Sequence, residues 1–536
     1  MSVELRISGM TCETCARHVE RALTQAGAGA VDVDWRESRA IADLAGTAPE
    51  TLARALDGTK YGVQRVIERE GDRAGGEYDY DLAIVGSGGG AFAAAIAARR
   101  RELRVVMVER DAVGGTCVNV GCIPSKALLA AAEARHRAAH GRFRGIRTQA
   151  GPVDMSELVG AKDEIVAGLR QSKYVELADE YGFDIVEGNA RFVDGPALDV
   201  DGRRLEAAHY LIATGAEPHM PDVPGLAHSG YLTSTTAMER EDLPGSLLVV
   251  GGGYVAMEQA QLFAHLGSRV TMLVRSQLAR GEEPEVADVV RDAFLAEGIA
   301  IHEGVTPDEV HREGHAVTVL AGGREFRAEH LLVATGRRPR TEGLGLDEIG
   351  VELGGNGEIV VDGDLSTSRP RVWAAGDVTG HPQFVYVAAK HGGLVVENAF
   401  EQAGRRIDYS ALPRITFTNP TIASAGLTEA QAEAAGIECE CRVLELEHVP
   451  RAIVSRNTRG LVKLVAEREG GRLVGVHIVG DGAGDVILAG SLAIQAGMTV
   501  EQLADGWNPY LTLGEGLYLA AQSFHRDPSK LSCCAA

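Results

Sequence analysis

Residues 80–91 read YDLAIVGSGGGA, and this stretch decides the fold of most of the chain. The apolar run predicts a buried strand, and the glycines after it predict a tight turn into a helix. Gly86, Gly88 and Ala91 form the pattern G-x-G-x-x-A, which brings the backbone close to a dinucleotide pyrophosphate. Glu109 ends the next predicted strand, where an acid is expected to meet a ribose hydroxyl. A tight turn without a ligand is the alternative, but strand, helix and acid in register favour dinucleotide binding.

A second unit of the same kind begins at SLLVVGGGYVA. Gly251, Gly253 and Ala256 repeat the pattern after another apolar strand. The next predicted strand ends in Arg275 instead of an acid, and Arg280 follows closely. A guanidinium at this position favours the 2′-phosphate of NADPH over the hydroxyl of NADH. The alternative is that both arginines are solvated surface charges.

Residues 114–126, GGTCVNVGCIPSK, carry the most specific motif. Cys117 and Cys122 are spaced as C-x4-C before a predicted helix that holds Lys126 in its first turns. A helix N-terminus stabilises a thiolate, so it lowers the pKa of a thiol and favours redox chemistry. Half a zinc site and a pair of buried structural cysteines are the alternatives, but no second pair at zinc-finger spacing follows nearby.

The composition is that of a globular protein with several domains. A prior of about 150 residues per domain predicts three or four domains for 536 residues, and 45% apolar residues are ample for their cores. The net charge of −22 argues against nucleic acid and anionic membranes as partners. No apolar run approaches the roughly 20 residues of a spanning helix, and no secretory signal is visible. Eight cysteines in such a chain indicate functional thiols in a reducing compartment, so we expect a cytoplasmic protein.

Residues 1–69 form a separate small unit. Its strand and helix patterns follow in the order βαββαβ, which predicts a ferredoxin-like sandwich. The first loop reads GMTCETC, with Cys12 on the loop and Cys15 at the start of the helix. Two thiolates in C-x-x-C suit soft ions that accept few ligands, Cu(I) or Hg(II), and a thioredoxin-like redox role is the alternative. Residues 70–78 are charged and glycine-rich and predict a linker.

These motifs, with LIATG, LLVATG and VWAAGD, resemble the flavin-dependent pyridine nucleotide–disulfide oxidoreductases over residues 78–536, and GMTCETC resembles the heavy-metal-associated domain. The resemblance implies an α/β fold: two Rossmann-like dinucleotide-binding domains and an α+β dimerisation domain, preceded by the small ferredoxin-like metal-binding domain. It implies FAD on the first fingerprint, NADPH on the second, and a homodimer. The implied limits are 1–69 for the heavy-metal-associated domain, 70–78 for the linker, 79–220 and 345–410 for the FAD-binding domain, 221–344 for the NADPH-binding domain and 411–536 for the interface domain with its Cys-Cys tail.

The same resemblance assigns roles to single residues. Hydride would pass from NADPH through the flavin to the cysteine pair, with Cys122 as the thiolate facing the flavin and Cys117 as the exchange thiol. Lys126 would lie near the reactive nitrogen of the flavin, paired with Glu258. The further positions that line FAD in relatives are Ala91, Thr116, Ala190, Asp377 and Val385.

The C-terminal residues indicate what kind of substrate is reduced. Disulfide reductases of this family carry a His–Glu dyad in a stretch like HAHPTLSE, and the corresponding residues 508–515 read NPYLTLGE. Glu515 is retained, but Tyr510 stands at the histidine position, and a phenol with a pKa of about 10 is a poor proton shuttle. An acceptor that needs no proton, such as a thiophilic metal ion, fits this loss. Cys533 and Cys534 in KLSCCAA offer two further thiols.

Together these features resemble the mercuric reductases of this family. The resemblance implies mercury detoxification by NADPH-dependent reduction of Hg(II) to Hg(0), with the metal relayed along three thiol pairs: Cys12 and Cys15, then Cys533 and Cys534, then Cys117 and Cys122. Tyr254 and Tyr510 resemble two tyrosines that flank the metal site, although Tyr254 could simply gate the flavin. The implied partners are a second subunit and Hg(II)–thiol complexes or a metal-donor protein. A thioredoxin-reductase-like enzyme and a soft-metal sequestration protein are the alternatives.

Cys439 and Cys441 lie at i and i+2 on a predicted strand, beside Glu438 and Glu440. A second metal clip is conceivable, but these acids do not stabilise thiolates, so we interpret the pair as small core residues. No H-x-x-x-H pair is expected on a predicted helix, so none of the 16 histidines is assigned to a metal ion.

Overall fold

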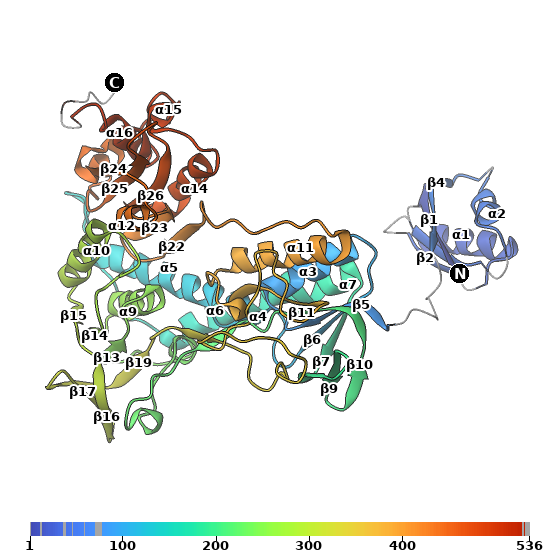
Figure 1. Ribbon diagram of the computed structural model, residues 1–536, viewed down its shortest axis with the longest axis horizontal. Helices are drawn as coiled ribbons and strands as arrows, with labels where there is room; N and C mark the ends of the chain where they lie inside the picture. The colour runs from blue at the N-terminus through green and yellow to red at the C-terminus, as the bar shows by residue number, and fades with distance from the viewer. Residues whose placement is uncertain are drawn as a thin grey trace. The chain divides into compact units, whose positions relative to one another are not determined.

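The computed structural model describes residues 2–10, 13–29, 31–35, 39–44, 47–57, 59–69, 78–527 and 530. The chain divides into two compact units, Met1–Asp79 and Tyr80–Ala536 (Figure 1). Residues 70–77 of the predicted linker lie outside the described residues. Within the described part of the chain, no helix is both long and apolar enough to cross a membrane.

The N-terminal unit is the predicted βαββαβ sandwich. Its four-stranded antiparallel sheet has the order β2-β3-β1-β4. Alternate residues of the first strand, Val3, Leu5 and Ile7, are fully buried and share one core with Val19 and Leu23 of the first helix. The elements are β1 (Ser2–Ser8), α1 (Glu13–Gln25), β2 (Val31–Asp34), β3 (Arg39–Asp43), α2 (Pro49–Arg54) and β4 (Gly62–Arg69).

The first fingerprint opens a five-stranded parallel sheet of order β21-β11-β5-β6-β7. Helices α3 and α11 lie side by side on this sheet (Figure 1). They approach so closely that a side chain at Gly392 would collide with the carbonyl of Gly90. The elements are β5 (Tyr80–Val85), α3 (Gly89–Arg99), β6 (Val105–Glu109), β7 (Asp184–Glu187), β11 (Ala207–Ile212), β21 (Val372–Ala374), the 3-10 turn η3 (Gly376–Thr379) and α11 (Val385–Glu401), with a small sheet of β8 (Ala190–Val193), β9 (Ala197–Val200) and β10 (Arg203–Leu205).

The second fingerprint opens a four-stranded parallel sheet of order β15-β14-β13-β19. A three-stranded antiparallel sheet, β16-β17-β18, packs into the same core. The elements are β13 (Ser246–Val250), α9 (Tyr254–Leu266), β14 (Arg269–Val274), α10 (Pro284–Ala296), β15 (Ala300–Glu303), β16 (Pro307–Glu313), β17 (Ala316–Ala321), β18 (Arg324–Ala328) and β19 (His330–Val333). The paired strands β12 (Ala216–Pro218) and β20 (Arg337–Pro339) join this unit to the first.

The C-terminal part is an antiparallel sheet of order β22-β23-β26-β25-β24 covered by helices. The predicted α/β class, with two Rossmann-like units and an α+β domain, is confirmed, whereas the exact domain limits stay predictions. The elements are β22 (Pro413–Thr416), β23 (Thr421–Gly426), α12 (Glu429–Ala434), β24 (Cys439–Glu445), η4 (Leu446–His448), α13 (Pro450–Val454), β25 (Leu461–Glu467), β26 (Leu473–Gly480), α14 (Ala483–Gln495), α15 (Val500–Ala504) and α16 (Glu515–Gln522).

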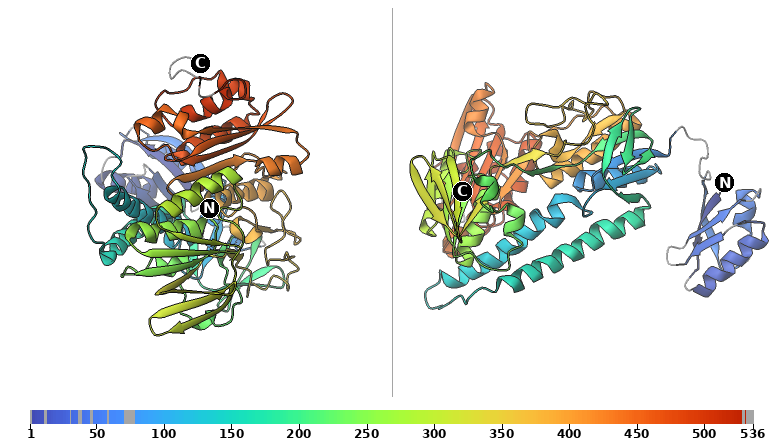
Figure 2. Two further views of the ribbon diagram at one scale, coloured as in Figure 1. Left: turned by 90° about the vertical axis from the view of Figure 1, so that its left-hand side faces the viewer. Right: turned by 90° about the horizontal axis from the view of Figure 1, so that it is seen from below.

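Between β6 and β7 the chain forms a group of helices. The long helices α5 and α6 run side by side, as the right-hand view of Figure 2 shows. The elements are α4 (Gly115–Asn119), α5 (Cys122–Ala139), α6 (Met155–Arg170), the π-helical turn η1 (Gln171–Val175) and α7 (Glu176–Tyr181). Short turns η2 (Leu226–His228) and α8 (Ser234–Ala237) precede the second fingerprint.

A buried ion cluster ties α10 to the C-terminal sheet. Lys463 on β25 is 2% exposed, and its Nζ lies 3.0 Å from Glu283, 2.9 Å from Glu285 and 2.8 Å from Glu429. Glu283 is also 2% exposed and precedes α10 as its N-cap. The cluster therefore joins residues about 180 positions apart.

Candidate active site

The redox cysteines lie on two consecutive helices beside the first fingerprint. Cys117 belongs to α4, and Cys122 is the first residue of α5. Gly115 has a φ of +65°, and a Cβ there would lie 2.6 Å from the Cα of Gly88, so only glycine allows this approach. Both cysteines line one cavity and are free thiols. The fold therefore brings the C-x4-C pair directly onto the phosphate-binding turn.

The two thiols differ in their tendency to ionise. The thiol of Cys117 hydrogen-bonds to Cys122 and, with Lys126 and the helix N-terminus, lowers the pKa of Cys122 to about 7, although burial opposes this shift. The same hydrogen bond and burial raise the pKa of Cys117. Cys122 is thus the thiol that ionises first. This supports its assignment as the thiolate facing the flavin, which stays a prediction.

Lys126 forms an ion pair with Glu258 on α9, with 2.7 Å between Nζ and Oε2. The predicted pairing of these two residues is confirmed. The backbone N–H of Phe417 donates to the other oxygen of Glu258 at 2.9 Å, and the ammonium lies 4.6 Å from the centre of the Phe417 ring. Glu258 is 6% exposed, so its charge depends on these partners. The pair fixes the ammonium beside the two thiols.

The low pKa of Cys122 predicts the pH dependence of its alkylation. Only the thiolate reacts, so the rate rises with pH, and with a pKa of about 7 it should rise roughly tenfold from pH 6 to pH 8 and then level off. An ordinary thiol with a pKa near 9 would gain about a hundredfold over the same interval without levelling off. Iodoacetamide labelling of the reduced protein, read by mass spectrometry of the Cys122 peptide, measures this. Cys441, whose pKa is raised by burial, is an internal control that should label slowly.

The first fingerprint forms the wall of a second cavity, and Gly88 and Thr116 line both this cavity and the cysteine cavity. Gly86 has a φ of +102°, and a Cβ there would lie 2.5 Å from the carbonyl oxygen of Ala213, whereas nothing fills the space over Gly88. Glu109 lines the far part, where its carboxylate accepts from Ser87 Oγ at 2.5 Å and from the backbone of Asp111 at 2.9 Å. An open glycine turn with an acid beyond it fits the pyrophosphate and ribose of FAD.

The second fingerprint lines a third cavity. Gly251 has a φ of +137°, and a side chain there would collide with the carbonyl of Ala334, whereas the space over Gly253 is open. Arg275 and Arg280 line this cavity and are exposed, as a 2′-phosphate site requires. Tyr254 lies on the walls of both this cavity and the cysteine cavity. Tyr254 therefore stands between the NADPH cavity and the thiols. Burial raises the pKa of the Tyr254 phenol.

The remaining predicted cofactor residues fall into two groups. Thr116, Asp377 and Val385 line the cysteine cavity, and Ala190 lines the cavity of the first fingerprint. Ala91 and Ala256 are fully buried between helix and sheet instead, where a larger residue would push the two apart. Their role is to permit close packing under the cofactor.

Sequence reasoning missed Arg337. Its guanidinium lies 3.9 Å from the carboxylate of Asp377, and it lines both the cysteine cavity and the NADPH-side cavity. Burial raises the pKa of Asp377, and this guanidinium opposes the shift. The signal was available, because Arg337 directly follows the second A-T-G motif.

The predicted C-terminal site residues are spread more widely. Tyr510 is 49% exposed, and Glu515 is buried at the start of α16, where burial raises its pKa. Among the described residues, the lining of the cysteine cavity contains neither of them. Cys533 and Cys534 lie outside the described residues. The catalytic roles of all four stay predictions.

In the N-terminal unit, Cys15 is buried at the start of α1, and Cys12 lies outside the described residues. The Nζ of Lys60 donates to the sulfur of Cys15 at 3.5 Å. A cation at this distance favours the thiolate form that binds metal. Sequence reasoning missed Lys60, which lies 45 positions from Cys15. Cys439 and Cys441 pack against a small core on β24, in agreement with a structural role.

Comparisons with known proteins agree with this geometry. Residues 80–392 match the family model "Pyridine nucleotide-disulphide oxidoreductase", residues 412–521 match its dimerisation domain, and residues 4–62 match the heavy-metal-associated domain. The chain is 58% identical to a mercuric reductase of Streptomyces lividans over 466 residues, 85% of this chain and 98% of that protein. It is 46% identical to a mercuric reductase of Lysinibacillus sphaericus over 541 residues, 99% of each chain.

Among solved structures, the flavoprotein disulfide reductase RclA from Escherichia coli superposes with a TM-score of 0.76 at 28% identity, covering 83% of this chain and 100% of that one. LpdA from Mycobacterium tuberculosis gives a TM-score of 0.75 at 26% identity, covering 83% and 100%. The extent and level of these matches place the chain in a family. It belongs to the pyridine nucleotide–disulphide oxidoreductases, within the group of the mercuric reductases.

Proposed function

We propose that this protein reduces Hg(II) to Hg(0) with electrons from NADPH. The observation that carries the proposal is the thiol pair Cys117 and Cys122, with one pKa near 7, in a cavity that shares wall residues with both dinucleotide cavities. In the overall reaction, NADPH and Hg(II) give NADP⁺, Hg(0) and one proton. The two-electron transfer therefore balances without another reductant.

The chain's own residues bind and orient the reactants. The turn at Gly86 and the carboxylate of Glu109 would hold FAD, and Arg275 with Arg280 would hold the 2′-phosphate of NADPH. When bound, FAD and NADPH supply the two electrons as a hydride equivalent. Tyr254 lines both cavities and would lie between the bound nicotinamide and the thiols.

The substrate itself is held by sulfur. Hg(II) is a soft ion that prefers thiolates and accepts two ligands, which suits Cys117 and Cys122. The nearby Lys126 ammonium stabilises the thiolate form of Cys122. Reduction of a disulfide releases a thiolate that a histidine protonates, whereas reduction of a metal ion needs no such proton. Tyr510 in place of the histidine therefore does not block the reaction.

Metal delivery would use thiol exchange. Cys12 and Cys15 would take up Hg(II) from thiol complexes or a donor protein, Cys533 and Cys534 would pass it on, and Cys117 with Cys122 would receive it. Lys60 beside Cys15 supports the capture step. The dimerisation-domain match supports a homodimer, and in such a dimer the tail of one subunit would serve the site of the other. Free thiols and NADPH dependence favour the cytoplasm.

The proposal is tested by adding Hg(II) with excess thiol to the FAD-loaded protein and NADPH. We expect one NADPH consumed for each Hg(0) released as vapour. Efficient reduction of thioredoxin or other disulfides without this release would indicate a disulfide reductase. Tight Hg(II) binding without NADPH oxidation would indicate a sequestration protein.

The relay predicts a specific effect of the tail. Cys533→Ala with Cys534→Ala should slow turnover of thiol-bound Hg(II) on the order of tenfold, because the effective concentration of metal at the inner pair falls. Flavin reduction by NADPH, followed by absorbance, should be unchanged. Ser532→Ala is the matched control in the same tail. Wild-type turnover of the double variant on thiol-bound Hg(II) would contradict the relay.

A further inference from the structure

His391 on α11 is a fully buried histidine that the mechanism above does not use. Its Nδ1 accepts a hydrogen bond from the backbone N–H of Gly376 at 3.1 Å, and its Nε2 lies 2.6 Å from the hydroxyl oxygen of Tyr409. Gly376 lines the cysteine cavity, so His391 supports the wall of that cavity from behind. The three residues form a chain of hydrogen bonds that leads from the cavity wall to the segment after α11.

The hydrogen bonds decide which ring nitrogen of His391 carries the proton. A backbone N–H can only donate, so Nδ1 must accept and carries no proton. Burial, together with the nearby His381, lowers the pKa of His391 to about 4, so the ring is neutral at pH 7 and holds its one proton on Nε2. Nε2–H then donates to the hydroxyl oxygen of Tyr409. This partner therefore favours the tautomer that accepts from Gly376.

Gly376 opens the short turn η3, which carries one of the predicted FAD-lining residues. Asp377 follows Gly376 directly and also lines the cysteine cavity. Gly376 has a φ of +78°, and a Cβ there would lie 3.1 Å from the Cβ of Ala388 on α11, so the turn and the helix are in close contact. The position of the Asp377 carboxylate therefore depends on how the backbone of Gly376 is held.

Tyr409 reaches His391 because the segment after α11 folds back along the helix. Asn398 lies about two turns after His391 on α11 and clamps this segment. Its side chain donates to the carbonyl of Arg405 and accepts from the N–H of Arg405, both at 2.9 Å. The ring of Tyr409 stacks against that of His381, with 5.3 Å between the centroids. The hydroxyl of Tyr409 is thus held in place by the path of the chain and by a ring contact.

We propose that His391 and Tyr409 are positioning residues for FAD. They act through the turn at Gly376, which they hold in the conformation that presents Asp377 to the cofactor. Without His391, the N–H of Gly376 would be a buried donor that has lost its acceptor, and the turn would shift to find another. The proposal rests on FAD binding as described under the proposed function, but it requires nothing of the mercury chemistry.

Two substitutions of His391 separate the hydrogen bond from packing. Leucine and asparagine have nearly the same size and shape, but only asparagine offers an acceptor, and its Oδ1 stands as many bonds from the backbone as Nδ1 of histidine does. If His391 serves only to fill space, His391→Leu and His391→Asn should have equal effects. If it positions the turn, His391→Leu should have the larger effect.

The test measures how fast FAD leaves the full-length, FAD-loaded protein after dilution, followed by flavin fluorescence. His391→Leu should release FAD at least about tenfold faster than the wild type, the effect of one buried donor left without its acceptor. His391→Asn should stay within about threefold of the wild type, because it keeps an acceptor for Gly376. The absorption spectrum of the bound flavin should change in His391→Leu and not in His391→Asn, because only the first variant moves the charge of Asp377.

Tyr409→Phe tests the outer hydrogen bond. It removes the acceptor of Nε2–H and should speed FAD release at least about threefold. Tyr518→Phe is the matched control, because the hydroxyl of Tyr518 also accepts a hydrogen bond, from Gln522 at 2.7 Å, but lies on α16 in the C-terminal part. It should release FAD as the wild type does.

Release of FAD at the wild-type rate by His391→Leu, or equal rates for His391→Leu and His391→Asn, would overturn the proposal. A wild-type rate for Tyr409→Phe would overturn the role of the pair, and this variant decides alone if His391→Leu does not fold. No Hg(II) is added in these measurements. Each result therefore stands whether or not the protein reduces mercury.

Discussion

Cys122→Ser should reduce Hg(II)-dependent NADPH oxidation by at least about 10³-fold, the scale on which loss of a reacting nucleophile acts. The structure gives the reason. Cys122 is the thiol whose pKa is lowered to about 7, and it is the first residue of α5. It lines the same cavity as Gly88 of the first fingerprint. Serine replaces a soft, ionisable sulfur with an oxygen that neither ionises at neutral pH nor binds Hg(II) well.

The measurement separates chemistry from cofactor binding. The variant should still bind FAD, and NADPH should still bleach its absorbance, because the two fingerprint cavities are formed by other residues. Cys441→Ser is the control, since Cys441 packs against a small core on β24 and its pKa is raised by burial. Retention of more than about a tenth of wild-type turnover by Cys122→Ser would show that electrons leave the flavin by another route.

The parts of the fold that follow local patterns could be predicted from the sequence. The turns between strand and helix at Gly86 and Gly251 require a positive φ and leave no room for a side chain, so they require glycine. These glycines can be recognised in a single sequence. The order of elements in residues 1–69 follows from alternation and helical spacing in the same way. These features depend on neighbours in the sequence.

The residues that were missed depend on neighbours in space. Lys60 reaches Cys15 across 45 positions. Arg337 follows a visible A-T-G motif, but its contact with Asp377 is created only where β20 meets the turn η3 in the fold.

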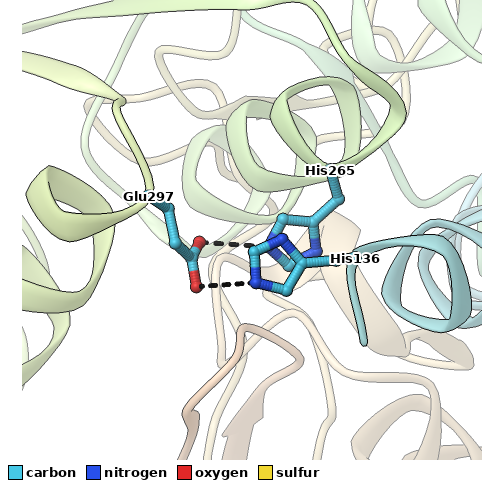
Figure 3. Close-up of side chains that lie close together, drawn as sticks. All are labelled: His136, His265 and Glu297. Carbon is cyan, nitrogen blue, oxygen red and sulfur yellow. Dashed lines mark hydrogen bonds and ion pairs between the residues drawn. The ribbon is translucent and has the colours of Figure 1, made fainter. Parts of the chain in front are cut away.

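The group of His136, His265 and Glu297 is an intermediate case. The expectation that no helix carries an H-x-x-x-H pair is wrong, because His136 on α5 and His140 at its C-cap have this spacing. The structure nevertheless places His136 beside His265 and Glu297, where α5, α9 and α10 end (Figure 3). Only the packing of three helix ends creates that group.

The largest stability effect should come from another long-range contact, at Lys463. Lys463→Met should lower the free energy of unfolding by roughly 3–5 kcal/mol, because removal of one partner leaves a buried charge uncompensated. Lys463 and Glu283 are both 2% exposed, so Glu283 cannot turn to water. Glu285 and Glu429 are 40% and 43% exposed and can rehydrate, which places the cost mainly on Glu283.

Urea or heat unfolding, followed by the fluorescence of FAD, measures this loss. Lys390→Met is the control, since Lys390 is exposed on α11, and it should change the stability by no more than about 0.5 kcal/mol. Adding Glu283→Gln to Lys463→Met should restore part of the stability, because the second change removes the unpaired charge. If the double variant is less stable than Lys463→Met alone, packing and not charge accounts for the loss.

The pH dependence gives an independent check on the same mechanism. In the wild type, the ammonium of Lys463 lowers the pKa of Glu429, so this pair contributes stability above the unfolded pKa of glutamate and loses it as the pH falls. In Lys463→Met this ion pair is absent, so Glu429 no longer makes that contribution. The difference in stability between wild type and variant should therefore be nearly constant from about pH 7 to about pH 5 and should shrink below about pH 4.5, where glutamate becomes protonated in the unfolded chain. A difference that stays constant down to about pH 3 would mean that the Lys463–Glu429 pair does not contribute to it.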